Sequence, residues 1–330
     1  MWFLGNIWQE MTKLYVIPLL LIFQLNFAQD IGLSSYLIFI ILIGIDSSHC
    51  YSTIFRTLMN KQERFRFKKL NTIMPLFIIS LVFIWCYFGV PYFWTFFLYI
   101  SIFHYLLQFY RYHKITLSMN PGSSSYSLEL VSISSLSFLS YHFRTSNGYD
   151  GFFFEDDLFL YPSNPLYSII LGVMVIIFLR SLVRIFFDFK KSQVNFCSLS
   201  SYLFPIFIII HCFNIADEFY KSFLPLIALH GLTYFHMIST AKAKIQKGLW
   251  KSKQNFMLIV ILFVSMTFGI LEYYFTINLV DIFKSEEYAG LVLPSLATVA
   301  VTLPSFYHYL ADFVLWSPQD AEYSKLIEAN

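Results

Sequence analysis

Charged residues are scarce in this sequence of 330 residues: Asp, Glu, Lys and Arg make up only 13%, whereas soluble domains carry about 25%. Hydrophobic residues make up 57%, and the mean hydropathy is +0.62. A water-soluble globule of this length could not hide so much apolar surface, and a disordered chain is poorer in apolar residues. The composition therefore excludes both classes and predicts an all-α protein that crosses a membrane several times.

The sequence also lacks the usual signatures of soluble enzymes and of disulfide scaffolds. It has only four cysteines (Cys50, Cys86, Cys197 and Cys212), and they form no C-x-x-C pair. Because they fall in apolar runs, we expect buried free thiols rather than disulfides or a thiolate metal site. There is no H-E-x-x-H, P-loop, G-x-S-x-G or G-x-G-x-x-G motif, and the histidine boxes of membrane desaturases are missing too.

Apolar runs that approach or exceed the roughly 20 residues of a membrane helix recur along the chain. We predict ten spans, at 14–28, 32–55, 73–90, 92–110, 126–143, 166–187, 197–216, 219–240, 255–275 and 290–316. No internal repeat stands out, so we expect a single integral membrane domain over residues 1–330. One alternative stays open for the first range, because Lys13 precedes an apolar run and Ala28, as in a cleaved signal peptide.

The basic residues fix the orientation of these spans. All of the 22 Lys and Arg residues except Arg144, Lys221 and Lys284 fall on one side of the predicted map. Basic residues mark the cytoplasmic side of a membrane protein. We therefore expect both termini in the cytoplasm, and we expect the protein in a bacterial cytoplasmic membrane.

Four of the eight histidines fall at similar depths in four different spans. His49, His104, His230 and His308 each lie within about ten residues of the cytoplasmic end of their span, at about 1.5 Å of rise per residue. His236 shares a span with His230 but lies about 120° away around the helix. We favour His230 as the inward residue, because Gly231 permits a close approach of helices.

Polar neighbours accompany these histidines on the same helix faces. Asp46 lies three residues before His49, Asp312 lies four after His308, and Gln108 lies four after His104. A metal-bound imidazole almost always donates its other N–H to a carboxylate or a carbonyl. The pattern therefore predicts a metal site with four histidine ligands and Asp46, Gln108 and Asp312 around them.

The donor set restricts the metal. Neutral imidazoles with oxygen partners suit Fe(II), Zn or Cu, and they exclude Ca and Mg. A site in the hydrocarbon region is open to lipid-soluble molecules and O₂, which favours iron. Arg56 lies on the same face as His49 at the cytoplasmic boundary. There it suits an anionic head group, an ion pair with Asp312 or the snorkelling role of a positive-inside arginine.

The motifs that contain these residues resemble a group of bacterial multi-pass membrane proteins. They are, in order, Asp46-Ser-Ser-His49, Thr53-Ile-Phe-Arg56-Thr57, Phe103-His104-x-x-x-Gln108, His230-Gly231-x-x-Tyr234 and His308-Tyr309-x-x-Asp312-x-x-x-Trp316. More remotely, the chain is similar to the Brp/Blh-type β-carotene dioxygenases, although Gly44-Ile-Asp-Ser-Ser-His49 lacks the Pro-His-Gly core of their first motif. This resemblance implies a polytopic membrane enzyme that holds iron with histidines and cleaves a carotenoid with O₂.

The leading interpretation is a membrane-embedded metal oxidoreductase or oxygenase. It would act on a lipophilic small molecule in the bilayer, such as a lipid or an isoprenoid. We expect no nucleic-acid partner. Two alternatives from other classes stay open. The histidine and aspartate pairs also suit a proton- or metal-coupled transporter, and they suit a scaffold protein whose histidines form hydrogen bonds between helices.

Overall fold

The computed structural model describes residues 12–27, 40–59, 64–65, 67–118, 120, 122–144, 163–216, 219–245, 260, 263–272, 274 and 292–315. These residues form helices joined by short turns, and no strand occurs among them. The all-α class predicted from composition is therefore correct for this part of the chain.

The main helical stretches follow one another along the chain. Their bounds are η1 Thr12–Val16, α2 Ile17–Phe27, η2 Ile40–Ser47, α4 Ser48–Met59, α6 Lys68–Tyr87, α7 Phe93–Ser118, α8 Ser127–Phe143, α9 Asn164–Lys190, α10 Phe196–Ile210, η4 His211–Ile215, α11 Phe219–Ile245 and α13 Val292–Leu315. The three labelled η are π-helical stretches, and each continues directly into or out of an α-helix.

Short turn signals set several helix ends. Gly89 (φ 60°) and Tyr92 (φ 67°) form the turn between α6 and α7 in the left-handed region. Asn195 begins α10, because its side-chain oxygen accepts a hydrogen bond from the backbone N–H of Cys197 at 2.8 Å. Pro165 lies at the start of α9, where its missing N–H costs nothing.

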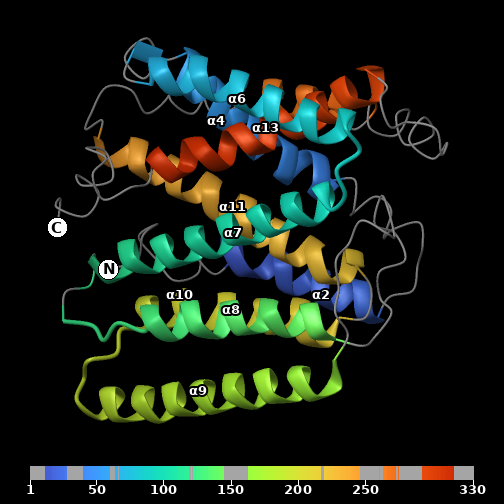
Figure 1. Ribbon diagram of the computed structural model, residues 1–330. Coiled ribbons are helices and arrows are strands. Elements are labelled where there is room, and N and C mark those ends of the chain that lie inside the picture. Colours follow the sequence, from blue (N-terminus) through green and yellow to red (C-terminus); the bar gives the residue numbers. More distant parts are fainter. Residues whose placement is uncertain are drawn as a thin grey trace.

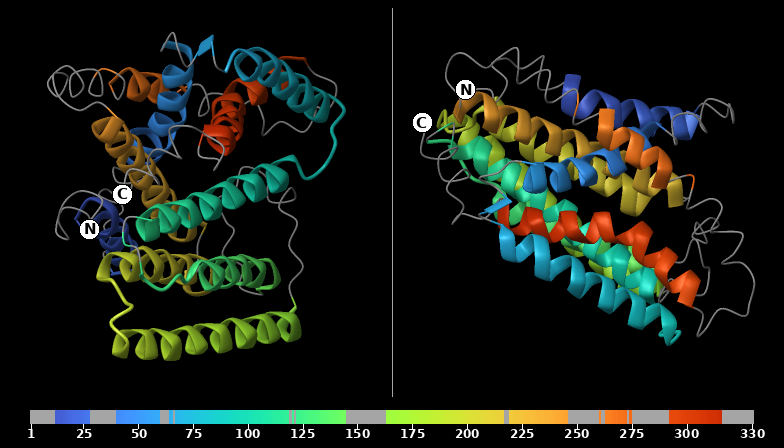
Figure 2. Two further views of the ribbon diagram at one scale, coloured as in Figure 1. Left: turned by 90° about the vertical axis from the view of Figure 1, so that its left-hand side faces the viewer. Right: turned by 90° about the horizontal axis from the view of Figure 1, so that it is seen from above.

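The helices lie side by side in a bundle (Figures 1 and 2). α9 forms one border and packs against α8, while α7, α8 and α10 all pack against one another. α11 contacts α2, η2 and α7 in the middle, while α13 packs against α6 and α4 at the opposite border. The main apolar core therefore runs through α7, α11 and α13, which are the helices that carry three of the four predicted histidine ligands.

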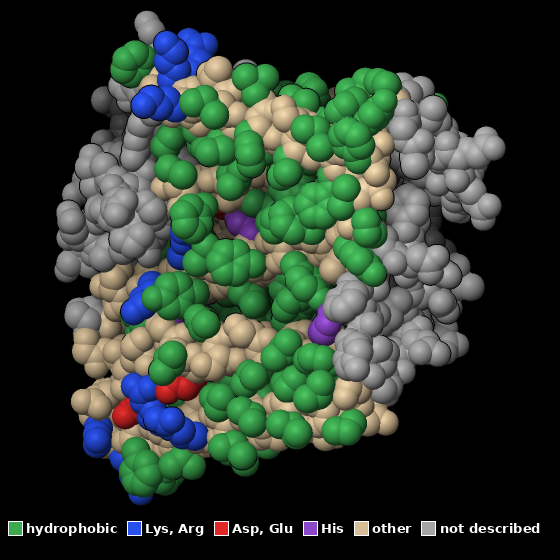
Figure 3. Space-filling model, in the orientation of Figure 1, with side chains coloured by type: hydrophobic (Ala, Val, Ile, Leu, Met, Phe, Trp, Pro, Cys, Tyr) green, Lys and Arg blue, Asp and Glu red, His purple; other side chains and the backbone are tan. Residues whose placement is uncertain are grey.

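Within the described part of the chain, three helices are long and apolar enough to cross a membrane. They are Lys68–Tyr87, Asn164–Lys190 and Phe196–Ile215, whose most apolar 18-residue segments have mean hydropathies of 1.9, 2.4 and 1.8. Large apolar side chains cover much of the outside of the bundle in Figure 3, as they do on α9, where Ile176 is 67% exposed.

Described helical residues overlap all ten predicted ranges, and the ends differ most at α7. We expected the fourth range to end at residue 110. Instead α7 continues to Ser118, so Arg111, His113 and Lys114 are helical. The apolar run stops at residue 110, but no helix-breaking residue occurs before Pro121 and Gly122, so the helix extends beyond it.

The Ser-rich range at 126–143 forms α8 because partners meet its polar groups. Glu129 accepts a hydrogen bond from Arg184 of α9 at 2.6 Å. Ser137 donates to the sulfur of Met174 at 3.0 Å, and Ser140 donates to Asn214. Side chains of other helices thus remove the cost of burying these polar groups.

Candidate metal centre

Four buried imidazoles from four helices converge at one place in the bundle. His49 lies on α4, His104 on α7, His230 on α11 and His308 on α13, and none is more than 5% exposed. Neighbouring ring centroids are 4.6 Å apart for His49 and His308, 4.7 Å for His49 and His230, 4.8 Å for His104 and His308, and 4.9 Å for His104 and His230. The rings form a closed square, with 6.1 Å between the centroids of His230 and His308 across it.

The Nε2 atoms of these rings point toward one another in pairs. Nε2 of His230 lies 2.9 Å from Nε2 of His49, and Nε2 of His104 lies 3.1 Å from Nε2 of His308. Two nitrogens bound at about 2.1 Å to one ion lie about 3.0 Å apart at a right angle and about 3.4 Å apart at a tetrahedral angle. Both separations therefore fit a shared ion, and they also fit an N–H···N hydrogen bond.

A close contact between α11 and η2 brings two of the histidines together. A Cβ at Gly231 would overlap Cγ2 of Ile45 and lie 3.3 Å from its carbonyl oxygen. That same carbonyl oxygen lies 3.0 Å from Nδ1 of His49. Gly231 thus allows the backbone of α11 to reach η2, and the inward orientation expected for His230 agrees with the structure.

A hydroxyl from a neighbouring helix orients His308. Thr53 Oγ1 lies 2.8 Å from Nδ1 of His308, and it also hydrogen-bonds the hydroxyl of Tyr234. Tyr234 belongs to α11 and is fully buried. Thr53 and Tyr234 therefore link α4, α11 and α13 next to the four rings, and their place beside His308 was not evident from sequence spacing.

The two predicted carboxylates lie close to the rings but are not their nearest partners. Asp46 Oδ1 is 3.7 Å from Nδ1 of His49, which is nearer to the Ile45 carbonyl. Asp312 lies 3.8 Å from Nδ1 of His308 and 3.9 Å from Nε2 of His104. The expected direct hydrogen bonds to carboxylates are replaced by a carbonyl and a hydroxyl, because those groups reach Nδ1 from closer positions.

Arg111 holds the backbone that carries Asp312. Its guanidinium donates hydrogen bonds to the carbonyl oxygens of Asp312 at 2.9 Å and Phe313 at 3.2 Å. These are carbonyls near the end of α13, where the intrahelical partners run out. Arg111 is only 8% exposed, so the extension of α7 beyond residue 110 has a direct effect on this site.

Gln108 contacts a different histidine from the one that sequence spacing suggested. Its Nε2 donates to the backbone carbonyl of His230 at 2.9 Å, and no hydrogen bond to the His104 ring occurs among the described residues. The expected role beside His104 is therefore wrong. Gln108 instead ties α7 to α11 at the level of the cluster, because its side chain reaches the neighbouring helix.

Cys50, which we expected to be a buried free thiol away from any metal site, is buried and free but lies beside the histidines. Its sulfur lies 3.6 Å from Nε2 of His49 and 3.9 Å from the hydroxyl of Ser305. Two groups of three residues each place one possible ligand atom per residue within 4.8 Å of the other two. The first group is His49, Cys50 and His308, and the second is His104, His230 and His308. Adjacent residues diverge by 100° on a helix, so the sequence His49-Cys50 gave no sign of this proximity.

The remaining described histidine side chains have partners elsewhere. His113 Nδ1 lies 2.8 Å from Ser201 Oγ, and His142 Nδ1 lies 2.7 Å from the hydroxyl of Tyr99. His211 Nε2 lies 3.4 Å from Nδ2 of Asn26. The side chains of His236 and Arg56 lie outside the described residues, so the head-group contact expected of Arg56 stays a prediction.

The sequence matches no protein-family model, no curated protein and no solved structure.

Proposed function

We propose that the chain is a polytopic membrane protein with ten spans, with both termini in the cytoplasm, in a bacterial cytoplasmic membrane. Three lines support this topology: the three helices of membrane length, the apolar exterior and the position of the basic residues. On the face in Figure 3, Lys and Arg gather toward one end of the helices, as expected for a cytoplasmic side.

We further propose that His49, His104, His230 and His308 bind one transition-metal ion. The observation that supports this most strongly is the convergence of four buried imidazoles from four helices, with Nε2 pairs at 2.9 and 3.1 Å. Burying four polar rings in an apolar bundle is costly unless each nitrogen has a partner, and an ion would serve several of them at once.

The proposed function is that of a non-haem iron oxidoreductase or oxygenase that acts on a lipid or an isoprenoid. Iron(II) held by imidazoles would supply one-electron and O₂ chemistry. The protein would contribute fixed ring orientations: the Ile45 carbonyl holds His49, and the Thr53 hydroxyl holds His308. The carboxylates of Asp46 and Asp312, each less than 4 Å from a ring nitrogen, favour a positive charge at the centre.

Elemental analysis of protein purified without chelators tests this proposal. We expect near-stoichiometric iron in the native protein and a strong loss of metal in His49→Ala, His104→Ala and His308→Ala. His142→Ala and His211→Ala are matched controls, because these rings hydrogen-bond Tyr99 and Asn26 away from the cluster, and both variants should keep the metal.

Two results would contradict the proposal. One is native protein that contains no metal and takes up none when supplied with Fe(II), Zn(II) or Cu(II). The other is an equal metal content in all five alanine variants. Either result would favour a hydrogen-bonded histidine cluster.

A further inference from the structure

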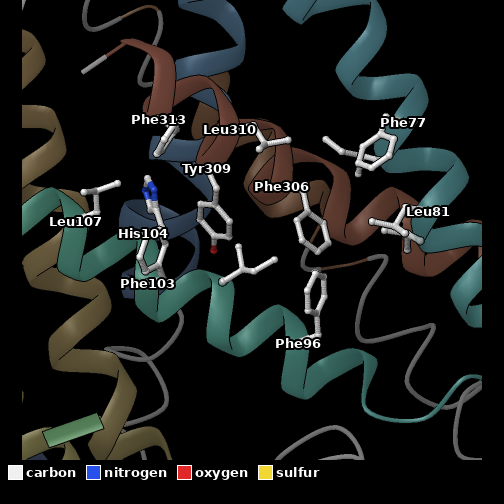
Figure 4. A pocket seen from close by; sticks show the side chains of 13 residues that line it. Phe77, Leu81, Phe96, Phe103, His104, Leu107, Phe306, Tyr309, Leu310 and Phe313 are labelled. Carbon is white, nitrogen blue, oxygen red and sulfur yellow. The ribbon is translucent and has the colours of Figure 1, made fainter. Parts of the chain in front are cut away.

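An apolar cavity lies against the histidine cluster, between α6, α7 and α13. Its volume is about 230 Å³, and Figure 4 shows His104 at one end of its wall, beside Tyr309. Apart from these two, every lining residue has a hydrocarbon side chain: Phe77, Ile78, Leu81, Val82, Phe96, Ile100, Phe103, Leu107, Phe306, Leu310 and Phe313. His104 is thus shared between the cavity and the proposed metal centre.

The wall runs from the outer surface of the bundle to its interior. Phe77, Phe103 and Phe313 are 57%, 63% and 56% exposed, so they mark the outer rim. Val82 and Phe306 are 1% and 6% exposed and form the inner wall. The rim residues belong to helices that we propose to cross the membrane, so the cavity would open toward lipid chains.

The polar groups of the wall are directed elsewhere or already bonded. His104 points Nε2 at His308, 3.1 Å away, and the hydroxyl of Tyr309 donates to Ser101 at 2.9 Å. No Asp, Glu, Lys or Arg is among the lining residues. An anionic or zwitterionic head group would lose its hydration here without compensation, whereas a hydrocarbon would gain from burial.

The volume limits how much of a ligand the cavity can hold. Apolar cavities of about 150 Å³ take up a molecule the size of benzene. The volume of about 230 Å³ is therefore large enough for the end of an apolar chain but too small for a whole lipid.

We infer that this cavity binds the apolar end of a long hydrocarbon chain, which reaches it sideways from the bilayer past Phe77 and Phe103 and stops against His104. The remainder of the chain stays in the membrane. The inference rests on the proposed function for the link to chemistry, but the binding itself does not require a metal. Fatty acyl chains and isoprenoid chains share this chemistry, and the experiment separates them.

Photolabelling of the full protein in phosphatidylcholine vesicles tests the inference. The probes are palmitic acid and farnesol, each with a diazirine at its apolar end, and palmitic acid with the diazirine beside the carboxylate. We expect the end-labelled probes to attach to peptides of α6, α7 and α13, and the carboxylate-labelled probe to miss them. Stronger labelling by farnesol would identify an isoprenoid chain, and stronger labelling by palmitic acid would identify an acyl chain.

Leu81→Trp and Ile100→Trp fill the cavity from two different helices. We expect each to reduce the labelling about tenfold or more, because two excluded methylene groups suffice for that change. Ile84→Trp is the control, since Ile84 is on α6, is 53% exposed and does not line the cavity. Equal labelling of Leu81→Trp, Ile100→Trp and Ile84→Trp, or equal labelling by the carboxylate-labelled probe, would overturn the inference.

Metal content measured on the same samples separates the two proposals. If native protein contains no metal but loses its labelling in Leu81→Trp and Ile100→Trp, chain binding in the cavity is supported and the proposed metal function is overturned. If the protein contains metal but its labelling is the same in all three Trp variants, only the proposal of chain binding is overturned.

Discussion

The second nitrogen of each imidazole decides how firmly the ring is held. Nδ1 of His49 faces the Ile45 carbonyl, which can only accept, so this nitrogen carries the proton and leaves the Nε2 lone pair for a metal. Nδ1 of His308 faces the Thr53 hydroxyl, whereas Nδ1 of His230 has no hydrogen-bond partner among the described residues. We therefore expect His49 and His308 to be better-oriented ligands than His230.

Thr53→Val removes the hydroxyl beside His308 and keeps the shape of the side chain. We expect metal affinity to fall by about 10–100-fold, as is typical when the group that orients a ligand is lost. Thr57→Val is the control, because Thr57 lies one turn later on α4 and its hydroxyl hydrogen-bonds Tyr307, at 2.8 Å. Competition with a chelator measures both affinities, and an unchanged affinity in Thr53→Val would show that the hydroxyl does not orient His308.

Asp312→Asn tests the contribution of the buried carboxylate. Its oxygens lie 3.8 and 3.9 Å from the ring nitrogens of His308 and His104, beyond hydrogen-bond distance. We expect the variant to keep the metal but bind it more weakly, with a smaller loss than Thr53→Val. The same chelator competition checks this, and a loss as large as that of His308→Ala would instead identify Asp312 as a direct ligand.

Depth along a helix could be read from the sequence, but side-chain partners could not. Counting residues from the cytoplasmic ends placed His49, His104, His230 and His308 at one level, and the structure brings these four together. The role of Gln108 was predicted wrongly, because spacing shows which residues share a helix face and not which neighbouring helix they meet. Cys50 and Thr53 approach the rings through helix packing, which no local pattern encodes.

At the scale of elements, α11 and η2 approach each other closely beside the cluster. Gly231→Ala would place a methyl group against Ile45, whose carbonyl orients His49. We expect a destabilised protein with reduced metal content, because Cγ2 of Ile45 must move away from the new methyl group and the Ile45 carbonyl oxygen, 3.3 Å from it, is crowded as well. Thermal unfolding followed by metal analysis measures both effects.

Gly172→Ala provides the matched control for that substitution. Gly172 lies on α9, and a Cβ there would meet no atom within 4 Å. Alanine in a helix interior is favoured over glycine by roughly 0.5–1 kcal/mol, so this variant should be at least as stable as the native protein. Equal behaviour of the two variants would show that the close approach at Gly231 is not required.

Helix ends were predicted less well than helix positions, for a physical reason. A hydropathy window ends where charge begins, yet α7 continues through Arg111 and Lys114 to Ser118. Helix formation depends on backbone hydrogen bonds, which do not stop at a membrane boundary, and no Pro or Gly interrupts α7. Hydropathy also understates the range 126–143, which is helical although it contains Glu129. The charge of Glu129 is paired with Arg184 of α9, a partner that lies outside the range.

At the scale of the whole molecule, the distribution of charge makes the sharpest prediction. With ten spans and cytoplasmic termini, reporter fusions after Lys69, Lys191 and Lys253 should all report the cytoplasm, and a fusion at Asp156 should report the outside. The reason is that Lys and Arg near the ends of spans are retained on the cytoplasmic side, and all but three of the 22 basic residues fall there. An even number of spans separates each pair of the three basic sites, so one missed span between them would reverse the later signals. Alkaline phosphatase activity at Lys69, Lys191 or Lys253 would therefore contradict the map, and the first site to show it would locate the error.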